Sequence, residues 1–252
     1  MDDATTARVA VVTGAGTGIG RAVAEAFLEA GLRVALVGRR PSPLHEVAGG
    51  HSSALVVPGD VSEESEVTRI FAAVDERWGR IDVLFNNAGV LGPSGMVDEI
   101  SLQDWNDTLA VNVTGTMLCA AEAVRLMKRQ SPPGGRIINN GSISAQRPRP
   151  RSLAYTVSKH AITGLTRSVA LDGRAWGISC GQIDIGNVQT AITQEIGTSA
   201  GALQADGSVR VEPTFAVADA ARAVLLMAQL PANVSIGSLT ITAMGMPFDG
   251  RG

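Results

Sequence analysis

The chain is short of tyrosine and lysine. Among its 252 residues Tyr155 is the only tyrosine, and Lys128 and Lys159 are the only lysines, although lysine and arginine together number 21. Aromatic residues make up 4% of the chain and hydrophobic residues 45%, so the core must be built from Ala, Val, Leu and Ile. Tyr155 and Lys159 are four residues apart, a spacing that puts two side chains on one face of a helix. Their scarcity elsewhere makes this pair a functional candidate.

Cysteine and histidine are also sparse. Cys119 and Cys180 are far apart and form no C-x-x-C pair, which argues against a disulfide framework or a zinc site. We expect two buried, reduced thiols and no bound metal. His45 and His51 lie in a connection that contains Gly and Ser, where surface positions are expected.

The chain also lacks a strong net charge and a long apolar run. Its net charge of −3 and pI near 5.6 argue against a nucleic-acid binder, which would usually be basic. The N-terminal stretch MDDATTARV has no apolar segment typical of a signal peptide, and no run approaches the ~18 apolar residues of a membrane span. The expectation is a soluble, cytoplasmic protein with no nucleic-acid or membrane partner.

The sequence does contain a regular alternation of two patterns. Short runs that are apolar almost throughout alternate with longer segments of helical spacing, and the second of these segments has Ser62 as a suitable N-cap. Apolar runs of this kind are typical of parallel strands covered on both faces, and β-α-β alternation implies right-handed crossovers. The prediction is an α/β protein with one Rossmann-type domain over residues 1–252, a doubly wound seven-stranded parallel sheet and helices on both faces. Strands are expected at 8–14, 33–38, 53–60, 81–89, 135–142, 178–185 and 237–243, and helices at 19–31, 62–79, 102–129, 152–175 and 217–230.

A glycine-rich turn joins the first strand to the first helix. The stretch TGAGTGIG places Gly14, Gly16, Gly18 and Gly20 there. Glycine permits positive φ and lets the backbone approach a pyrophosphate closely, and a helix N-terminus offers free N–H groups to that anion. A simple β-α turn without a ligand would leave so many glycines unexplained. The turn therefore predicts a dinucleotide site.

Further motifs follow in a fixed order. NNAG ends the fourth expected strand, Asn112 lies in the long helix within LAVNVTGT, Ser142 ends the fifth strand, and Y-x-x-x-K begins at Tyr155. Together with T-G-x-x-x-G-I-G from Thr13 to Gly20, these motifs resemble the short-chain dehydrogenase/reductase family over nearly the whole chain. The resemblance implies an enzyme that interconverts a ketone and a secondary alcohol by hydride transfer with a nicotinamide cofactor.

The resemblance also implies a role for each catalytic candidate. Tyr155 would exchange a proton with the substrate oxygen, Ser142 would hydrogen-bond the same oxygen, and Lys159 would bind the nicotinamide ribose. Asn112 would hold a water that links Lys159 to solvent. The pKa of a free tyrosine is near ~10, and a nearby ammonium and the positive nicotinamide ring are expected to lower it. His160 should point away from this side of the helix, and it is interpreted as structural or interfacial.

Cofactor choice depends on the end of the second strand. NAD-binding proteins of this fold usually have an acidic residue there, whereas this chain has Gly38 followed by Arg39 and Arg40. Arginine suits the 2′-phosphate of NADP, so NADP(H) is preferred and NAD(H) remains possible, since the two arginines could simply be solvated and the glycine turn has no basic residue. The resemblance makes Asp60 an adenine contact. The residues expected to bind the cofactor are Gly14, Gly16, Thr17, Gly18, Ile19, Gly20, Arg39, Asp60, Val61, Asn87, Ala88, Gly89, Tyr155, Lys159, Gly186, Val188 and Thr190.

The segment between Ser142 and Tyr155 should form one wall of the substrate pocket, because ligands in this fold lie beyond the C-terminal ends of the strands. It contains Arg147, Arg149 and Arg151. These arginines either attract an anionic substrate or are solvated loop charges spaced by prolines.

A second wall is expected from a substrate lid at about 190–214, the stretch that forms a lid in similar proteins. Ile192, Ile196 and Leu203 could supply its apolar contacts. Just before it, Ile185-Gly186 replaces the Pro-Gly that is usual in the family. Losing the proline should loosen the turn that faces the nicotinamide.

The C-terminal stretch is the third wall. Where the family often ends in V-D-G-G, this chain has Met244, Met246 and Phe248, which could pack across a subunit interface. The helices that begin at Leu102 and Ser152 correspond to surfaces through which similar proteins associate. A homotetramer or homodimer is therefore expected.

Three functions remain open at this point. The first is an NADP(H)-preferring oxidoreductase acting on an unidentified ketone or secondary alcohol. The second is a 3-oxoacyl-[acyl-carrier-protein] reductase, for which the arginines near Tyr155 would form a docking patch. The third is a non-catalytic dinucleotide-sensing protein, which would be expected to lose Tyr155 or Lys159.

Overall fold

The computed structural model describes residues 7–190 and 201–248. A seven-stranded sheet in the order β3-β2-β1-β4-β5-β6-β9 forms its centre, and every paired strand in it is parallel. This confirms the predicted α/β Rossmann fold. The strands are β1 Val9–Thr13, β2 Arg33–Gly38, β3 Ala54–Pro58, β4 Val83–Asn86, β5 Gly135–Asn140, β6 Ile178–Ile185 and β9 Ser238–Ile241.

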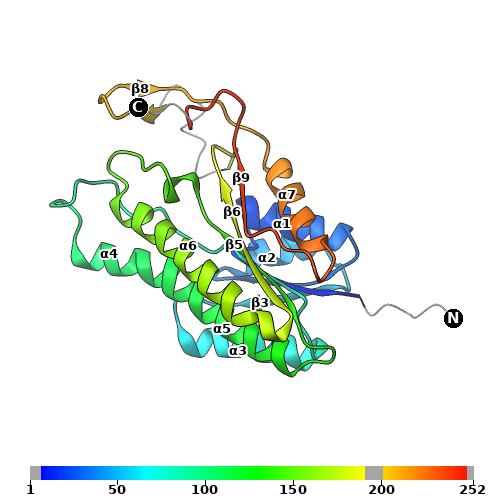
Figure 1. The fold of residues 1–252 in the computed structure, drawn as a ribbon. Helices are drawn as coiled ribbons and strands as arrows, with labels where there is room; N and C mark the ends of the chain where they lie inside the picture. Colours follow the sequence, from blue (N-terminus) through cyan, green and yellow to red (C-terminus); the bar gives the residue numbers. More distant parts are fainter. Residues whose placement is uncertain (1–6, 191–200, 249–252) are drawn as a thin grey trace.

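Helices cover both faces of the sheet. Helices α1 and α7 pack together on one side, and α3, α4, α5 and α6 lie on the other (Figure 1). The helices are α1 Gly18–Glu29, α2 Pro41–Ala48, α3 Glu64–Trp78, α4 Leu102–Leu109, α5 Thr116–Arg129, α6 Leu153–Gly173 and α7 Val217–Gln229, with short 3₁₀ turns at Ile143–Ala145 and Arg174–Trp176.

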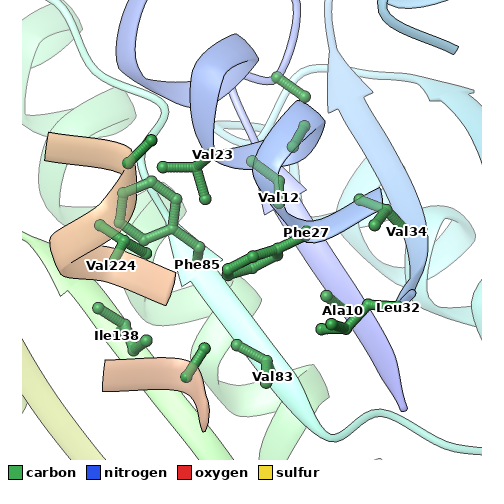
Figure 2. Close-up of a cluster of buried hydrophobic side chains, with 14 of the residues drawn as sticks. Ala10, Val12, Val23, Phe27, Leu32, Val34, Val83, Phe85, Ile138 and Val224 are labelled. Atoms are coloured by element: carbon green, nitrogen blue, oxygen red, sulfur yellow. The ribbon is translucent and has the colours of Figure 1, made fainter. Parts of the chain in front are cut away.

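Alternation along the strands builds two separate cores. In β1, Ala10 and Val12 face α1 and α7, whereas Val9 and Val11 face α3 and α5. Figure 2 shows the first core, in which Phe27 of α1 and Phe85 of β4 lie close to Val224 of α7. Because β1 is buried on both faces, its five residues are apolar except for the terminal threonine.

Two local predictions near the ends of β2 and β3 are wrong. Helix α2 was not predicted, and His45 lies in it with its side chain exposed, while His51 is exposed in the following turn. Ser62 does not cap α3, because its N–H and hydroxyl both donate to Asp60 Oδ1, at 3.0 and 2.7 Å. The helix starts only at Glu64, since this Asp60 turn competes with helical geometry.

The helical segment 102–129 is continuous but not uniform. It consists of α4, a π-helical turn at Ala110–Gly115, and α5. By length and composition alone this 28-residue segment could cross a membrane, but in the fold it packs against α3, α6 and the sheet. The π turn places Asn112 in the segment's buried face, which the helical pattern did not predict.

A small antiparallel hairpin stands beyond the sheet. It pairs β7 Ala202–Leu203 with β8 Val209–Arg210 and belongs to the expected lid. Two of the expected lid residues, Ile192 and Ile196, lie outside the described residues. In the C-terminal stretch Met246 is buried against Ile143 and Ala243 of its own chain.

Both cysteines are buried and free, as predicted. Burial raises the pKa of Cys119 and that of Cys180 to about 12. Both thiols are therefore protonated near neutral pH and poor nucleophiles.

Candidate active site

The predicted catalytic residues come from three elements at the C-terminal edge of the sheet. Ser142 follows β5 by two residues, Tyr155 and Lys159 lie on the first turns of α6, and Asn112 lies in the π turn. The Lys159 ammonium is 5.5 Å from the centre of the Tyr155 ring. The one-face spacing predicted for this pair therefore holds.

Lys159 is almost entirely buried. Its Nζ donates a 2.7 Å hydrogen bond to the backbone oxygen of Asn140, and only 6% of the residue is exposed. Burial disfavours the charged form and lowers the pKa of Lys159 to about 8, although the charge of Asp184 acts in the opposite direction. The ammonium is thus bound by the neutral Asn140 oxygen, and the Asp184 carboxylate acts on it without a direct contact among the described residues.

The structure departs from the expectation for Tyr155. Burial raises its pKa above the ordinary value, and the negative charge of Asp184 raises it further, while a hydrogen bond with Ser142 opposes both. The expected lowering does not occur because desolvation outweighs the favourable contacts in the protein alone. Tyr155 is therefore a protonated phenol near neutral pH.

Ser142 is held through its backbone and its hydroxyl. Its N–H donates to Asp184 Oδ1 at 2.9 Å, and its Oγ accepts a 3.1 Å hydrogen bond from the N–H of Ser144. The hydroxyl keeps its proton for an acceptor in the site, which is Tyr155 in the protein alone and would be a substrate oxygen when a substrate is bound.

Asn112 ties the π turn to the segment after β4. Its Oδ1 accepts from the N–H of Val90 at 2.8 Å, and its Nδ2 donates to the Val90 oxygen at 2.8 Å and to Ser158 Oγ at 3.0 Å. Among the described residues no hydrogen bond joins Asn112 to Lys159 directly. A role in a relay would therefore require an intervening group.

Two cavities meet at the glycine turn. The first, of about 170 Å³, also has Gly38 and Arg40 in its wall; its predicted cofactor residues are Gly14, Gly16, Thr17, Arg39, Asp60, Val61, Ala88 and Gly89. The second, of about 220 Å³, is lined by the predicted residues Gly14, Thr17, Gly18, Ile19, Asn87, Ala88, Gly89, Tyr155, Lys159, Gly186, Val188 and Thr190. Together they run from the two arginines to Tyr155, the candidate catalytic tyrosine, as an extended dinucleotide requires.

The glycine turn fits a dinucleotide for two reasons. Gly14 and Gly18 have positive φ values of 66° and 54°, which glycine adopts without strain. Gly20, the one predicted cofactor residue that lines neither cavity, packs beneath the turn, where a Cβ would lie 2.2 Å from the Gly14 oxygen. Thr17 caps α1 without a side-chain hydrogen bond, so no capping side chain occupies the N–H groups of the first turn.

A buried threonine joins this turn to β4. Thr13 Oγ1 accepts from the N–H groups of Asn87 and Ala88, at 2.9 and 3.0 Å, and Asn87 Nδ2 donates to the Thr13 oxygen at 2.9 Å. These contacts give NNAG a structural role at the wall of the cavity. They hold the two turns at a constant separation.

A third cavity, of about 250 Å³, adjoins the second at Tyr155 and Ile185. Its wall also contains Ser142 together with apolar residues from three loops, namely Leu91, Pro93, Ile143 and Pro150. A substrate carbonyl placed here would lie beside the catalytic serine and tyrosine. The third cavity is therefore the candidate substrate pocket.

Two of the three loop arginines are ion-paired. Arg149 binds Glu212 with Nη2 at 2.6 Å, and Arg151 binds Glu99 at 2.6 Å. Burial by itself would raise the pKa of Glu212, but hydrogen bonds from Arg149, Gln204 and Asn187 lower it to about 2. The sequence offered two roles for these arginines, attraction of an anionic substrate or solvated loop charges. The structure shows a third role for Arg149 and Arg151, because each pairs with a carboxylate of the chain itself.

Sequence reasoning missed several residues of the site. Asp184, Gln146 and the backbone oxygen of Asn140 all contact catalytic residues or their immediate support. One indication was available for Asp184, because an acid stands in the otherwise largely apolar strand ISCGQIDI. His160 was interpreted correctly as facing away: it is exposed, and its ring contacts the Thr156 oxygen.

A parallel sheet whose strand ends carry a glycine turn, an extended cavity and a Ser-Tyr-Lys set defines a dinucleotide-dependent oxidoreductase. The family model described as short chain dehydrogenase matches residues 8–201. The chain belongs to the short-chain dehydrogenase/reductase family, as the motifs predicted. It is an NAD(P)(H)-dependent enzyme that interconverts ketones and secondary alcohols.

Its relatives act on different substrates. The chain is 37% identical to a 3beta-hydroxysteroid dehydrogenase of Mediterraneibacter gnavus, over 74% of this chain and 68% of that protein. It is 39% identical to the 2-(R)-hydroxypropyl-CoM dehydrogenase of Xanthobacter autotrophicus, over 74% and 77%. The structure resembles a 3-ketoacyl-(acyl-carrier-protein) reductase from Brucella melitensis complexed with NADH, with TM-score 0.82 and 24% identity, covering 93% of this chain and 96% of that one.

Proposed function

We propose that the protein is an NADP(H)-preferring ketone reductase with an uncharged, largely apolar substrate. The observation that carries this proposal is the junction of the second and third cavities at Tyr155, with Arg39 and Arg40 at the far end of the first. The proposed catalytic domain comprises residues 1–252 with a lid at about 190–214.

The residue roles follow from the contacts. When bound, the nicotinamide supplies the hydride. Ser142 donates a hydrogen bond from its hydroxyl to the substrate oxygen and orients it, and Tyr155 transfers its proton to that oxygen. Lys159 keeps a positive charge behind Tyr155, which stabilises the phenolate that forms. Asn112 keeps the Val90 segment in place, and a water held beside it would link Lys159 to solvent, which returns the proton to the buried pair.

The cofactor preference rests on Gly38, Arg39 and Arg40. The position that would hold an acid in an NAD-binding protein has no side chain, and both arginines line the adenosine end of the cavity. Neither forms an ion pair with a carboxylate of the described residues. They are therefore free to bind a 2′-phosphate.

The first experiment is a titration of the purified protein with NADPH and, separately, with NADH, followed by nicotinamide fluorescence at constant salt. We expect NADPH to bind at least tenfold more tightly. Tighter binding of NADH would overturn the NADP preference and favour alcohol oxidation. If neither cofactor bound, the non-catalytic sensing function would be revived despite the intact Tyr155 and Lys159.

The substrate class rests on charge and apolar lining. Arg149 and Arg151 are paired with Glu212 and Glu99, so the third cavity offers no unpaired cation among the described residues that line it. This disfavours the acyl-carrier-protein alternative, which needs an arginine patch. Of the three loop arginines, Arg147 is the one without an ion pair among the described residues, and its charge reversal should leave turnover of a small ketone unchanged. A raised KM confined to a carrier-bound substrate would restore the alternative.

We also propose a cytoplasmic homotetramer or homodimer. Large apolar side chains are exposed on the helices of one face: Leu102 and Leu171 are 75% and 63% exposed, and Met117 and Val157 are 41% and 37% exposed. An apolar face of this kind is typical of an interface between subunits. A monomer by light scattering would contradict the proposal.

A further inference from the structure

We propose that Asp184 is a positioning residue of the active site: its buried carboxylate accepts from the N–H of Ser142 and, through that serine, acts on Tyr155. The proposal deepens the proposed function, since it takes Ser142 and Tyr155 as the catalytic pair. Asp184 lies on β6, opposite the end of β5, and only 2% of it is exposed.

Among the described residues, every hydrogen bond to the Asp184 carboxylate comes from a neutral N–H donor. Oδ1 accepts from the N–H of Ser142 at 2.9 Å and from Gln182 Nε2 at 2.6 Å, and Oδ2 accepts from Gln146 Nε2 at 3.0 Å. Donors at both oxygens suit an ionised carboxylate. No ion pair neutralises it among the described residues, so its charge acts on its surroundings.

The backbone beside Asp184 is adapted to it. A Cβ on Gly141 would lie 2.1 Å from Asp184 Oδ1 and 2.6 Å from Gln182 Nε2, so the carboxylate can occupy this position only because residue 141 is glycine. On one side of Gly141 the Asn140 oxygen binds Lys159, and on the other the Ser142 N–H binds Asp184. One three-residue segment therefore aligns the lysine and the serine.

The same network reaches the helix that carries the tyrosine. Gln182 Nε2, which donates to Asp184, also donates to Thr163 Oγ1 on α6 at 3.2 Å. A buried carboxylate with no contacting cation is costly, and it persists where surrounding donors hold it. Here those donors come from β6, the loop after β5 and the loop before α6, which are the three walls around Ser142.

Among the described residues, the unpaired charges that act on Tyr155 come from two elements. The Lys159 ammonium of α6 lies over its ring, and the Asp184 carboxylate of β6 accepts from the N–H of Ser142. Arg149 and Arg151 line the same cavity but are paired with Glu212 and Glu99. Asp184 raises the pKa of Tyr155 and also that of Lys159, so it favours the protonated form of both groups. That is the state in which Tyr155 can give a proton to a ketone.

The test uses the fact that Tyr155 is the only tyrosine. Phenolate absorbance in the near ultraviolet therefore reports the ionisation of one group, with Tyr155→Phe as the blank and no substrate needed. Asp184→Asn removes the charge but keeps an oxygen for the Ser142 N–H, and the Gln146 amide can turn to accept from the new NH₂ group. We expect the Tyr155 titration to move to lower pH by about 0.5–1 unit.

The matched control is Asp82→Asn, which removes another shielded carboxylate, one that is paired with Arg80 at the opposite edge of the sheet. Asp82→Asn should leave the pH midpoint of the Tyr155 titration unchanged. Asp184→Ala should lower that midpoint as Asp184→Asn does. An unchanged midpoint in folded Asp184→Asn, an equal shift in Asp82→Asn, or loss of the fold in both Asp184 variants would each overturn the proposal. Because no substrate or cofactor enters the measurement, failure of the proposed function would appear separately, in the cofactor titration.

Discussion

The ammonium of Lys159 donates its 2.7 Å hydrogen bond to the backbone oxygen of Asn140, two residues before Ser142. The catalytic helix and the end of β5 are therefore joined by a charged contact inside the protein. This contact orients Lys159 toward the cofactor cavity, and no carboxylate of the residues that the structure describes pairs with its charge. The buried charge of Lys159 that serves the proposed reaction therefore lowers the stability of the fold.

Replacing Tyr155 by Phe should abolish most turnover while the fold and cofactor binding are retained. The phenol supplies the proton, and loss of such a group usually lowers the rate by about 10²–10⁴-fold. Steady-state kinetics together with NADPH fluorescence titration would measure both properties. Turnover within about tenfold of the wild type would show that another group transfers the proton.

Lys159→Met should inactivate the enzyme and stabilise the fold. Burial lowers the pKa of Lys159 from 10.5 to about 8, so the charged lysine opposes folding below pH 8, and this penalty disappears as the pH rises from 8 to 10.5. We expect a gain of about 1–2 kcal/mol in the free energy of unfolding at pH 7, after loss of the Asn140 hydrogen bond, and a smaller gain at pH 10. Urea denaturation at both pH values measures it.

The other lysine provides the control for that experiment. Lys128 is exposed and lies over the ring of Trp176, with 5.0 Å from its ammonium to the ring centre. Lys128→Met should therefore give no stabilisation that depends on pH. An equal gain in both variants would show that the effect belongs to methionine in a helix and not to the buried charge.

Gly38→Asp should reverse the cofactor preference. A Cβ at Gly38 would meet Leu44 at 3.4 Å, an ordinary contact, so the side chain fits. Its carboxylate would accept from ribose hydroxyls and repel a 2′-phosphate, so NADPH binding should weaken about tenfold or more relative to NADH. Gly38→Ala fits equally and adds no charge. If Gly38→Ala changed the ratio of the NADPH and NADH dissociation constants as much as Gly38→Asp does, the size of the side chain rather than its charge would determine the preference.

Glu212→Gln should loosen the hairpin of β7 and β8. Glu212 binds Arg149 at 2.6 Å and Asn187 at 2.7 Å, which anchors the lid to the rim of the substrate pocket. The variant should lower the free energy that is needed to open the hairpin by about 1–3 kcal/mol. This would be measured as faster amide hydrogen exchange at residues 201–213. Glu99→Gln, which breaks the exposed pair with Arg151, is the control and should leave that exchange unchanged.

The pH dependence of the lid follows from the same pair. The pKa of Glu212 is lowered from 4.5 to about 2, so its contribution is complete above pH 4.5 and is lost as the pH falls toward 2. The protection factors of the amides at residues 201–213, which correct for the pH dependence of the exchange chemistry, should therefore fall as the pH falls from 4.5 toward 2. Constant protection factors in protein that remains folded would exclude Glu212 as the anchor.

Leu171→Glu should reduce the size of the assembly. Leu171 is 63% exposed on α6, and a charge there would be buried if this helix forms the proposed interface. Light scattering should show a smaller species than the wild type. Val209→Glu on the hairpin, where Val209 is 57% exposed, is the control. Equal dissociation by both variants would place the interface elsewhere.

Much of the fold could be predicted because its information is local. Apolar runs such as RVALVG match β2 at the same bounds, and the amphipathic segment after TGAGTGIG is α1. Helix α2 was missed because its pattern is short and contains two prolines, Pro41 and Pro43, at its start. The π turn was missed because it preserves the apolar spacing on both sides.

The sequence by itself determined the family, the order of the strands along the chain and the candidate catalytic residues, because Tyr155, Lys159 and the glycine turn occur at spacings that depend on one helix or one turn. Only the tertiary structure decided what surrounds them. Asp184 meets Ser142 across 42 residues, and Arg149 meets Glu212 across 63. The local pattern cannot specify such contacts, because they exist only when separate strands and loops pack together. Burial and neighbouring charge, which set the ionisation of Tyr155 and Lys159, arise at the same step.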